Sequence, residues 1–173
     1  MRKIDLCLAF SKHCPDNKQH YAGLGPTQLS QMAEEYSSGL ALFMGIEIKR
    51  YGKGDLEAQS QLRTWLAAGV IHLRKLRSPE SRVSNLPILG WIVIGDEWRL
   101  YVAFGESDEE TAPIVILGPM NIDNKGSTSD LLGIFRLFRL MQMLKTWATE
   151  VYWPWFTKHI MEVAREKLAQ EKK

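Results

Sequence analysis

The feature that most constrains the fold is a strand, a tight turn and a helix that follow one another directly over residues 40–76. Residues 40–51, LALFMGIEIKRY, are mostly apolar, which predicts a largely buried strand. Gly52 and Gly54 interrupt the strand, and Asp55 is suited to cap a helix. The helix has apolar residues at the three- and four-residue spacing of one buried face: Leu62, Trp65, Leu66, Gly69, Val70, Leu73 and Leu76. A buried strand with a helix packed on it predicts a mixed α/β domain with a central sheet flanked by helices.

The remaining elements agree with this fold class. Apolar residues alternate over residues 3–10, KIDLCLAF, which predicts a first strand that carries Asp5. We expect a loop over 11–27 and a short helix over 27–40 with Thr27 as its cap. Further along, the sequence predicts a hairpin of strands 86–95 and 97–104, an acidic loop at 105–113, a strand at 114–118, and helices over 129–150 and 152–173. Pro154 lies near the first turn of the last helix.

Length and composition indicate one globular domain over residues 1–173, with a solvated tail from about residue 165. The formal net charge of +2 argues neither for nor against nucleic acid, so a polyanion would need a local patch. The first residues, MRKIDLCLAF, make a poor secretory signal because the apolar run is short and contains Asp5. The late apolar segment 131–144 contains Arg136 and Arg139 and is too short to span a bilayer. We therefore expect an intracellular protein, nuclear or cytoplasmic, with no membrane partner.

Glu47 and Lys49 stand two residues apart near the end of the predicted strand. Side chains at this spacing lie on the same face, with Ile48 turned away into the core. A carboxylate is a ligand suited to Mg²⁺, and an adjacent ammonium can orient water and offset phosphate charge. Asp5, on the other strand, can supply a second carboxylate. The alternative is an ordinary surface ion pair at a strand end, because an acid two residues before a lysine also occurs at 16–18, 123–125 and 171–173.

Five segments of the chain together resemble a known family. They are KIDLCLAF, GIEIKRYG, the helix EAQSQLRTWLAAGVIHLRKL, the hairpin LGWIVIGDEWRLYVAF, and the C-terminal run GSTSDLLGIFRLFRLMQMLKTWATEVYWPWF. The chain resembles the PD-(D/E)XK nuclease superfamily, and more narrowly the nuclease-like domain proteins of filamentous fungi. The resemblance implies a restriction-endonuclease-like core and metal-dependent hydrolysis of phosphodiester bonds, with Mg²⁺, or Mn²⁺ in its place, as the cofactor.

Carried over residue by residue, the resemblance implies a specific site. Asp5 and Glu47 would be metal ligands, and the backbone carbonyl of Ile48 a third. Lys49 would be the catalytic lysine, and Gln61 the helix glutamine beside the site. The literal Pro15–Asp16 pair competes with Asp5, but a loop aspartate is more typical of a turn.

Cationic residues near the proposed site are candidates for binding nucleic acid, with DNA as the expected partner: Arg50, Lys53 and Arg63. Members of the family usually carry a helix before the aspartate strand, whereas here Asp5 is the fifth residue. Either the core is truncated at the N-terminus or these elements are absent from it, and in both cases one flank of the sheet would be uncovered. The rival function is that of a non-catalytic domain that binds nucleic acid or a protein partner. A third possibility is an enzyme that acts on RNA.

Overall fold

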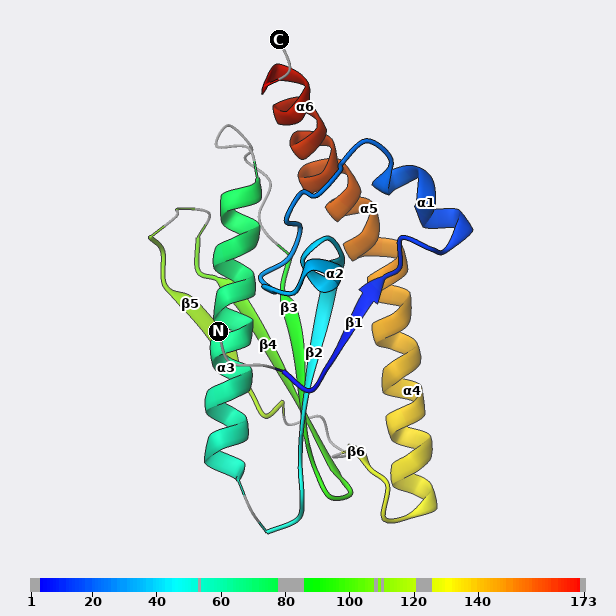
Figure 1. The fold of residues 1–173 in the computed structure, drawn as a ribbon. Coiled ribbons are helices and arrows are strands. Elements are labelled where there is room, and N and C mark those ends of the chain that lie inside the picture. Colours follow the sequence, from blue (N-terminus) through cyan, green and yellow to red (C-terminus); the bar gives the residue numbers. More distant parts are fainter. Residues whose placement is uncertain are drawn as a thin grey trace.

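The predicted mixed α/β architecture is confirmed by the computed structural model, which describes residues 4–52, 54–77, 86–107, 109, 111–120 and 126–171. A central sheet of six strands has the order β1-β2-β3-β4-β5 over these residues, with β6 paired to β4 (Figure 1). Only the β2–β3 pair is parallel among the described pairs. The strands are β1 Leu6–Phe10, β2 Ala41–Lys49, β3 Ile88–Ile94, β4 Glu97–Gly105, β5 Ile114–Leu117 and β6 Gly126–Ser127. The predicted hairpin is β3–β4, and it turns at Gly95, where φ is +59°.

Two long helices cover the sheet. Helix α3, Asp55–Leu76, buries the predicted apolar face in the larger core cluster. Helix α4, Leu131–Trp147, packs through Leu137 on a second cluster formed by Met44, Ile46, Leu89, Trp91, Val93 and Leu100. Met44 and Ile46 of β2 belong to this second cluster, whereas Gly45 between them lies against Trp65 of α3, because strand side chains alternate between faces. The sheet therefore has an α3 face, on which Gly45 lies, and an α4 face, on which Met44 lies.

The C-terminal region forms one continuous helical run, where the sequence predicted two helices. After α4 it comprises a π-helical turn Ala148–Tyr152, α5 Trp153–Phe156, a second π-helical turn Thr157–Met161, and α6 Glu162–Glu171. Pro154 lies between the π turns, where the hydrogen-bond register already shifts, so its missing N–H does not end the helix. Tyr152 is fully buried, and its hydroxyl donates to the Leu42 carbonyl oxygen at 2.7 Å. This bond attaches the helical run to β2.

The segment between β1 and β2 differs from the prediction. The expected loop contains α1, Pro15–Tyr21, which begins at a proline as first turns often do. The expected helix over 27–40 is reduced to α2, Glu35–Ser38. Thr27 does not cap it; its hydroxyl donates to the Leu24 carbonyl oxygen. Local hydrogen bonds of this kind compete with helix formation. None of the helices in the described residues is long and apolar enough to cross a membrane.

Candidate metal and catalytic site

The site lies where the start of β1 meets the end of β2. The strands pair antiparallel, with Leu6 opposite Ile46. Asp5 was expected on the strand, but the strand begins at Leu6 and Asp5 lies one residue before it. Its Oδ2 accepts a hydrogen bond from the Ile48 backbone N–H at 2.7 Å. The carboxylate thus takes the place of the next backbone acceptor in the ladder, which fixes Asp5 beside residues 47–49.

Glu47 is the most deeply buried acid of the site, with 1% of its surface exposed. Its Oε1 pairs with Lys49 Nζ at 2.8 Å. Its Oε2 is buried and has no hydrogen-bond partner in the described structure. Burial raises the pKa of Glu47, the hydrogen bond from Lys49 opposes this, and the charge of Asp5 raises the pKa further. A buried, unpartnered carboxylate oxygen is costly in the free protein, and a cation would supply the missing partner.

Lys49 is held at the edge of the site, with 22% of its side chain exposed. The hydrogen bond to Glu47 is the largest cause that raises the pKa of Lys49, so the ammonium is charged at neutral pH. Gly54 closes the turn after β2 with φ +81°, and a Cβ there would lie 3.4 Å from Lys49 Cδ. The turn therefore packs on the Lys49 stem, which restricts where its ammonium can point.

Ile48 does not turn into the core as expected; 45% of its surface is exposed on the α4 face of the sheet. The reason is that α4 leaves this end of β2 uncovered, together with Leu6 on β1. The Ile48 N–H points to the β1 side, while Lys49 O accepts from Gly95 N on the β3 side at 3.2 Å. Since the N–H and C=O of one strand residue point to the same edge, the Ile48 carbonyl oxygen is also directed to the side of Asp5.

Helix α3 adds two polar residues to the site. Gln61 Nε2 donates to Glu57 Oε1 one helical turn earlier at 3.1 Å, and Gln61 Oε1 is buried without a partner in the described structure. The charge of Glu57 raises the pKa of both Glu47 and Lys49, which places it within electrostatic reach of them. Sequence reasoning missed Glu57. The signal that it overlooked is the four-residue spacing from Gln61, which puts both side chains on one side of a helix.

The close approach of α3 to β2 depends on Gly45. A Cβ on Gly45 would lie 2.8 Å from the Trp65 ring, which is closer than real side chains come. Gly45 and Glu47 share the α3 face of the strand, and Trp65 follows Gln61 by one helical turn. The Gly45–Trp65 contact therefore sets how Gln61 lies relative to Glu47.

The predicted phosphate-binding cations are not gathered at one point. Arg50 is exposed directly after β2, next to Lys49. Arg63 is exposed on α3, but two residues correspond to about 200° around a helix, so it lies away from Gln61. Its charge acts on Tyr101 of β4 instead. Lys53 falls outside the described residues. Asp16 lies in α1, beyond the end of β1 that pairs with Ala41, and so at the opposite end of this strand from Glu47.

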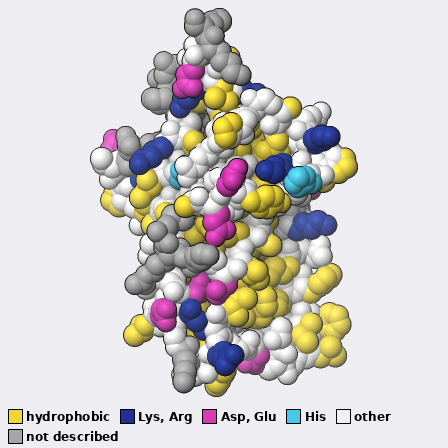
Figure 2. Space-filling view, in the orientation of Figure 1, with side chains coloured by type: hydrophobic (Ala, Val, Ile, Leu, Met, Phe, Trp, Pro, Cys, Tyr) yellow, Lys and Arg dark blue, Asp and Glu magenta, His cyan; other side chains and the backbone are white. Residues whose placement is uncertain are grey.

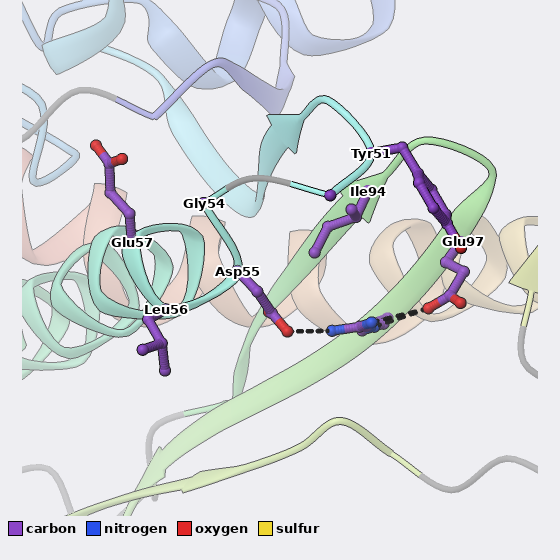
Figure 3. Close-up of a pocket in the computed structure, with 9 residues that line it drawn as sticks. Tyr51, Gly54, Asp55, Leu56, Glu57, Ile94 and Glu97 are labelled. Carbon is purple, nitrogen blue, oxygen red and sulfur yellow. Dashed lines mark hydrogen bonds and ion pairs between the residues drawn. The ribbon is translucent and has the colours of Figure 1, made fainter.

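An open pocket of about 680 Å³ lies next to the site, between the start of α3 and the β3–β4 hairpin. Figure 3 shows Asp55 and Glu57 pointing in different directions from the first turn of α3. Asp55 and Glu97 both pair with Arg99, at 3.0 and 2.8 Å. These two ion pairs neutralise the charge of Arg99. The pocket thus extends the site but offers little positive charge of its own to a phosphate.

Comparison with known proteins identifies the family. The sequence profile of the PD-(D/E)XK nuclease superfamily matches residues 1–153, which include every element of the site. The chain belongs to this superfamily. Searches of curated proteins and of solved structures gave no match. The broad resemblance inferred from the sequence is therefore confirmed, and nucleic acid is the substrate class that the superfamily implies.

PD-(D/E)XK nucleases typically use divalent metal ions, and the donor set suits such a cation. The described residues contain no cluster of three or more acids, histidines or cysteines that could hold a metal. A cation would therefore rest on two carboxylates, from Asp5 and Glu47, and on the Ile48 carbonyl. Backbone carbonyls and water commonly complete the coordination of Mg²⁺ and Ca²⁺. The unpartnered Glu47 Oε2 is the observation that fits a bound cation best.

Proposed function

We propose that the chain is a Mg²⁺-dependent nuclease that hydrolyses phosphodiester bonds of DNA. The observation that carries the proposal is the buried Glu47 carboxylate, which has one oxygen on Lys49, the other unpartnered, and the charge of Asp5 within electrostatic reach. Mn²⁺ would serve in place of Mg²⁺. The proposal treats residues 1–173 as one nuclease-like domain and includes the narrower kinship with the nuclease-like proteins of filamentous fungi.

In this proposal each residue has a distinct task. Asp5, Glu47 and the Ile48 carbonyl would hold the cation, which when bound would activate a water and offset negative charge on the phosphate. Lys49 stays protonated, because its hydrogen bond to Glu47 raises its pKa. It therefore acts as a hydrogen-bond donor and a positive charge toward the reacting phosphate, and does not take the proton of the water. Gln61 holds Glu57 in place and keeps a free carbonyl oxygen for the water.

A domain that only binds nucleic acid or protein is the rival function. Binding a polyanion favours exposed cations, and it gains nothing from a buried acid that lacks a partner. Such a group reduces stability and is characteristic of active sites, where pKa values are shifted for chemistry. The geometry of Glu47 therefore favours the enzyme over the binding domain.

Plasmid nicking tests the proposal. The purified chain should nick supercoiled DNA with Mg²⁺ or Mn²⁺ and stop when a chelator is added. Labelled single-stranded DNA and RNA of equal sequence, assayed in parallel, distinguish the two substrates. Binding of DNA with no cleavage under any of these conditions would support the rival function, and cleavage of RNA alone would overturn the choice of DNA.

A further inference from the structure

Helix α4 is apolar on its outer side as well as its inner side. Leu131, Phe135 and Phe138 are 69%, 62% and 60% exposed. The outer apolar face of α4 is defined here by these residues together with Leu132, Ile134 and Met143. Large apolar side chains exposed together on one element commonly mark an interaction surface. Figure 2 shows hydrophobic side chains gathered along the side of the molecule where α4 lies, and between α4 and β1.

The size of this face is close to that of a protein interface. Because large side chains each present on the order of 150–250 Å², the exposed fractions leave roughly 700 Å² of apolar surface open on α4. The largest apolar patch of a typical monomer covers about 300–600 Å². Each partner of a standard interface contributes about 800 Å². The outer apolar face is therefore larger than a monomer usually leaves open, and large enough for a stable dimer.

A groove adjoins this face. A cavity of about 530 Å³ lies between α4 and β1, lined by apolar side chains that include Leu8, Phe43 and Met141. Leu6 and Leu8 of the edge strand β1 remain exposed on the same side of the sheet. A cavity of this volume is in the range that encloses a small molecule, so an aromatic side chain fits. One surface thus carries both protruding aromatic residues and a hollow that can receive them.

We propose that the outer apolar face of α4 and the adjoining groove form a two-fold interface with a second copy of this chain. A two-fold interface uses the same patch on both subunits, so the patch must complement itself. The protruding phenylalanines next to the groove meet this requirement. Residues 131–147 contain Arg136, Arg139 and Lys145 but no acid, and Tyr36 of α2 lines the groove together with Lys145. This inference does not depend on the proposed chemistry.

Sedimentation velocity across the micromolar range tests the interface. The unmodified chain should sediment as a dimer. The double variant Phe135→Asp, Phe138→Asp should be a monomer, with the dissociation constant of the dimer raised roughly 100-fold or more. Both residues are exposed, so the far-UV circular dichroism should not change. Leu56→Asp is the matched control: Leu56 is more exposed than either phenylalanine but lies on α3, and the dimer should persist.

A second variant distinguishes insertion of side chains into the groove from nonspecific hydrophobic association. Thr149→Trp adds apolar surface but fills the groove, so the interface predicts a weaker dimer. A dimer that this variant strengthens, or one that survives the double aspartate variant, would overturn the proposed interface. A chain that stays monomeric at all concentrations would overturn it too. So would a monomer that binds anionic lipid vesicles through α4, since an apolar helix with arginines is also typical of membrane-surface binding.

Discussion

Replacing Glu47 by Gln should change stability in opposite directions without and with Mg²⁺. Without metal, the wild-type protein buries a carboxylate whose Oε2 has no partner in the described structure. Leaving such a group unsatisfied costs about 1–3 kcal/mol. Glu47→Gln keeps the shape, removes the charge, and places an amide that can donate toward Asp5. We expect the variant to be more stable by about 1 kcal/mol, which raises the melting temperature by roughly 2–4 °C in a domain of this size.

With Mg²⁺ the order should reverse. A ligand that binds only the folded state stabilises it by about 2.7 kcal/mol at a concentration of 100 times Kd. The wild-type protein should gain this stability, and the variant should gain little because it lacks one of the two carboxylates. Differential scanning fluorimetry over a Mg²⁺ titration measures both effects. Plotted against Mg²⁺ concentration, the melting temperatures of the wild type and of Glu47→Gln should cross.

Glu97→Gln is the matched control for this prediction. Glu97 also lies on a strand and pairs with a base two residues later, Arg99 at 2.8 Å, but 38% of its side chain is exposed. Removing this exposed pair should change stability by about 0–1 kcal/mol and leave the Mg²⁺ response intact. Equal Mg²⁺ responses in wild type and Glu47→Gln would refute the metal site. A Glu47→Gln protein less stable than wild type without metal would refute the argument from the unpartnered oxygen.

The remaining predictions concern single residues. Lys49→Ala should retain the Mg²⁺-induced rise in melting temperature and lose about 10²–10³-fold in nicking rate, measured by single-turnover kinetics. Arg50→Ala should lower the slope of log DNA affinity against log salt by about one, measured by anisotropy, with little change in the cleavage rate at saturation. Gly45→Ala should destabilise by about 1–3 kcal/mol in urea, because its Cβ would overlap the Trp65 ring. Glu57→Gln removes a charge that raises the pKa of Glu47, so the acid limb of the pH–rate profile should move to lower pH.

The sequence predicted the elements with strong periodicity and missed those set by local hydrogen bonds. Strand 40–51, the helix from Asp55 and the hairpin at Gly95 agree with the structure to within two residues. Helix α1 was missed because its seven residues bury no side chain completely and so carry no apolar period. The continuous C-terminal helix was divided in two because Pro154 ordinarily ends a helix, and no sequence pattern announces a π-helical turn.

For the site, strand alternation predicted the pairing of Glu47 with Lys49 on one face, and the structure shows them in contact. Alternation also assigned Ile48 to the core, and this was wrong. The period tells which residues share a face, but not whether a helix reaches far enough along the strand to cover it. Leu6 and Leu8 of β1 are exposed on the same face of the sheet as Ile48. The position of Glu57 at the site depends on how α3 packs along the sheet. The Gly45–Trp65 contact determines this packing, and the sequence alone does not predict it.

The pKa of Glu47 links the stability of the fold to its proposed chemistry. Its folded-state pKa is raised, so the stability that it contributes is fully present below the unfolded pKa and is lost as pH rises through the folded pKa. Without metal, the ionised form of the carboxylate therefore opposes folding. The difference in unfolding free energy between the wild type and Glu47→Gln should become smaller as the solution is acidified. A cation reverses this, because it favours the ionised form and supplies the partner that Oε2 lacks. The same burial that weakens the free protein thus makes Glu47 a strong ligand, and metal affinity should fall on the acid side of the folded-state pKa.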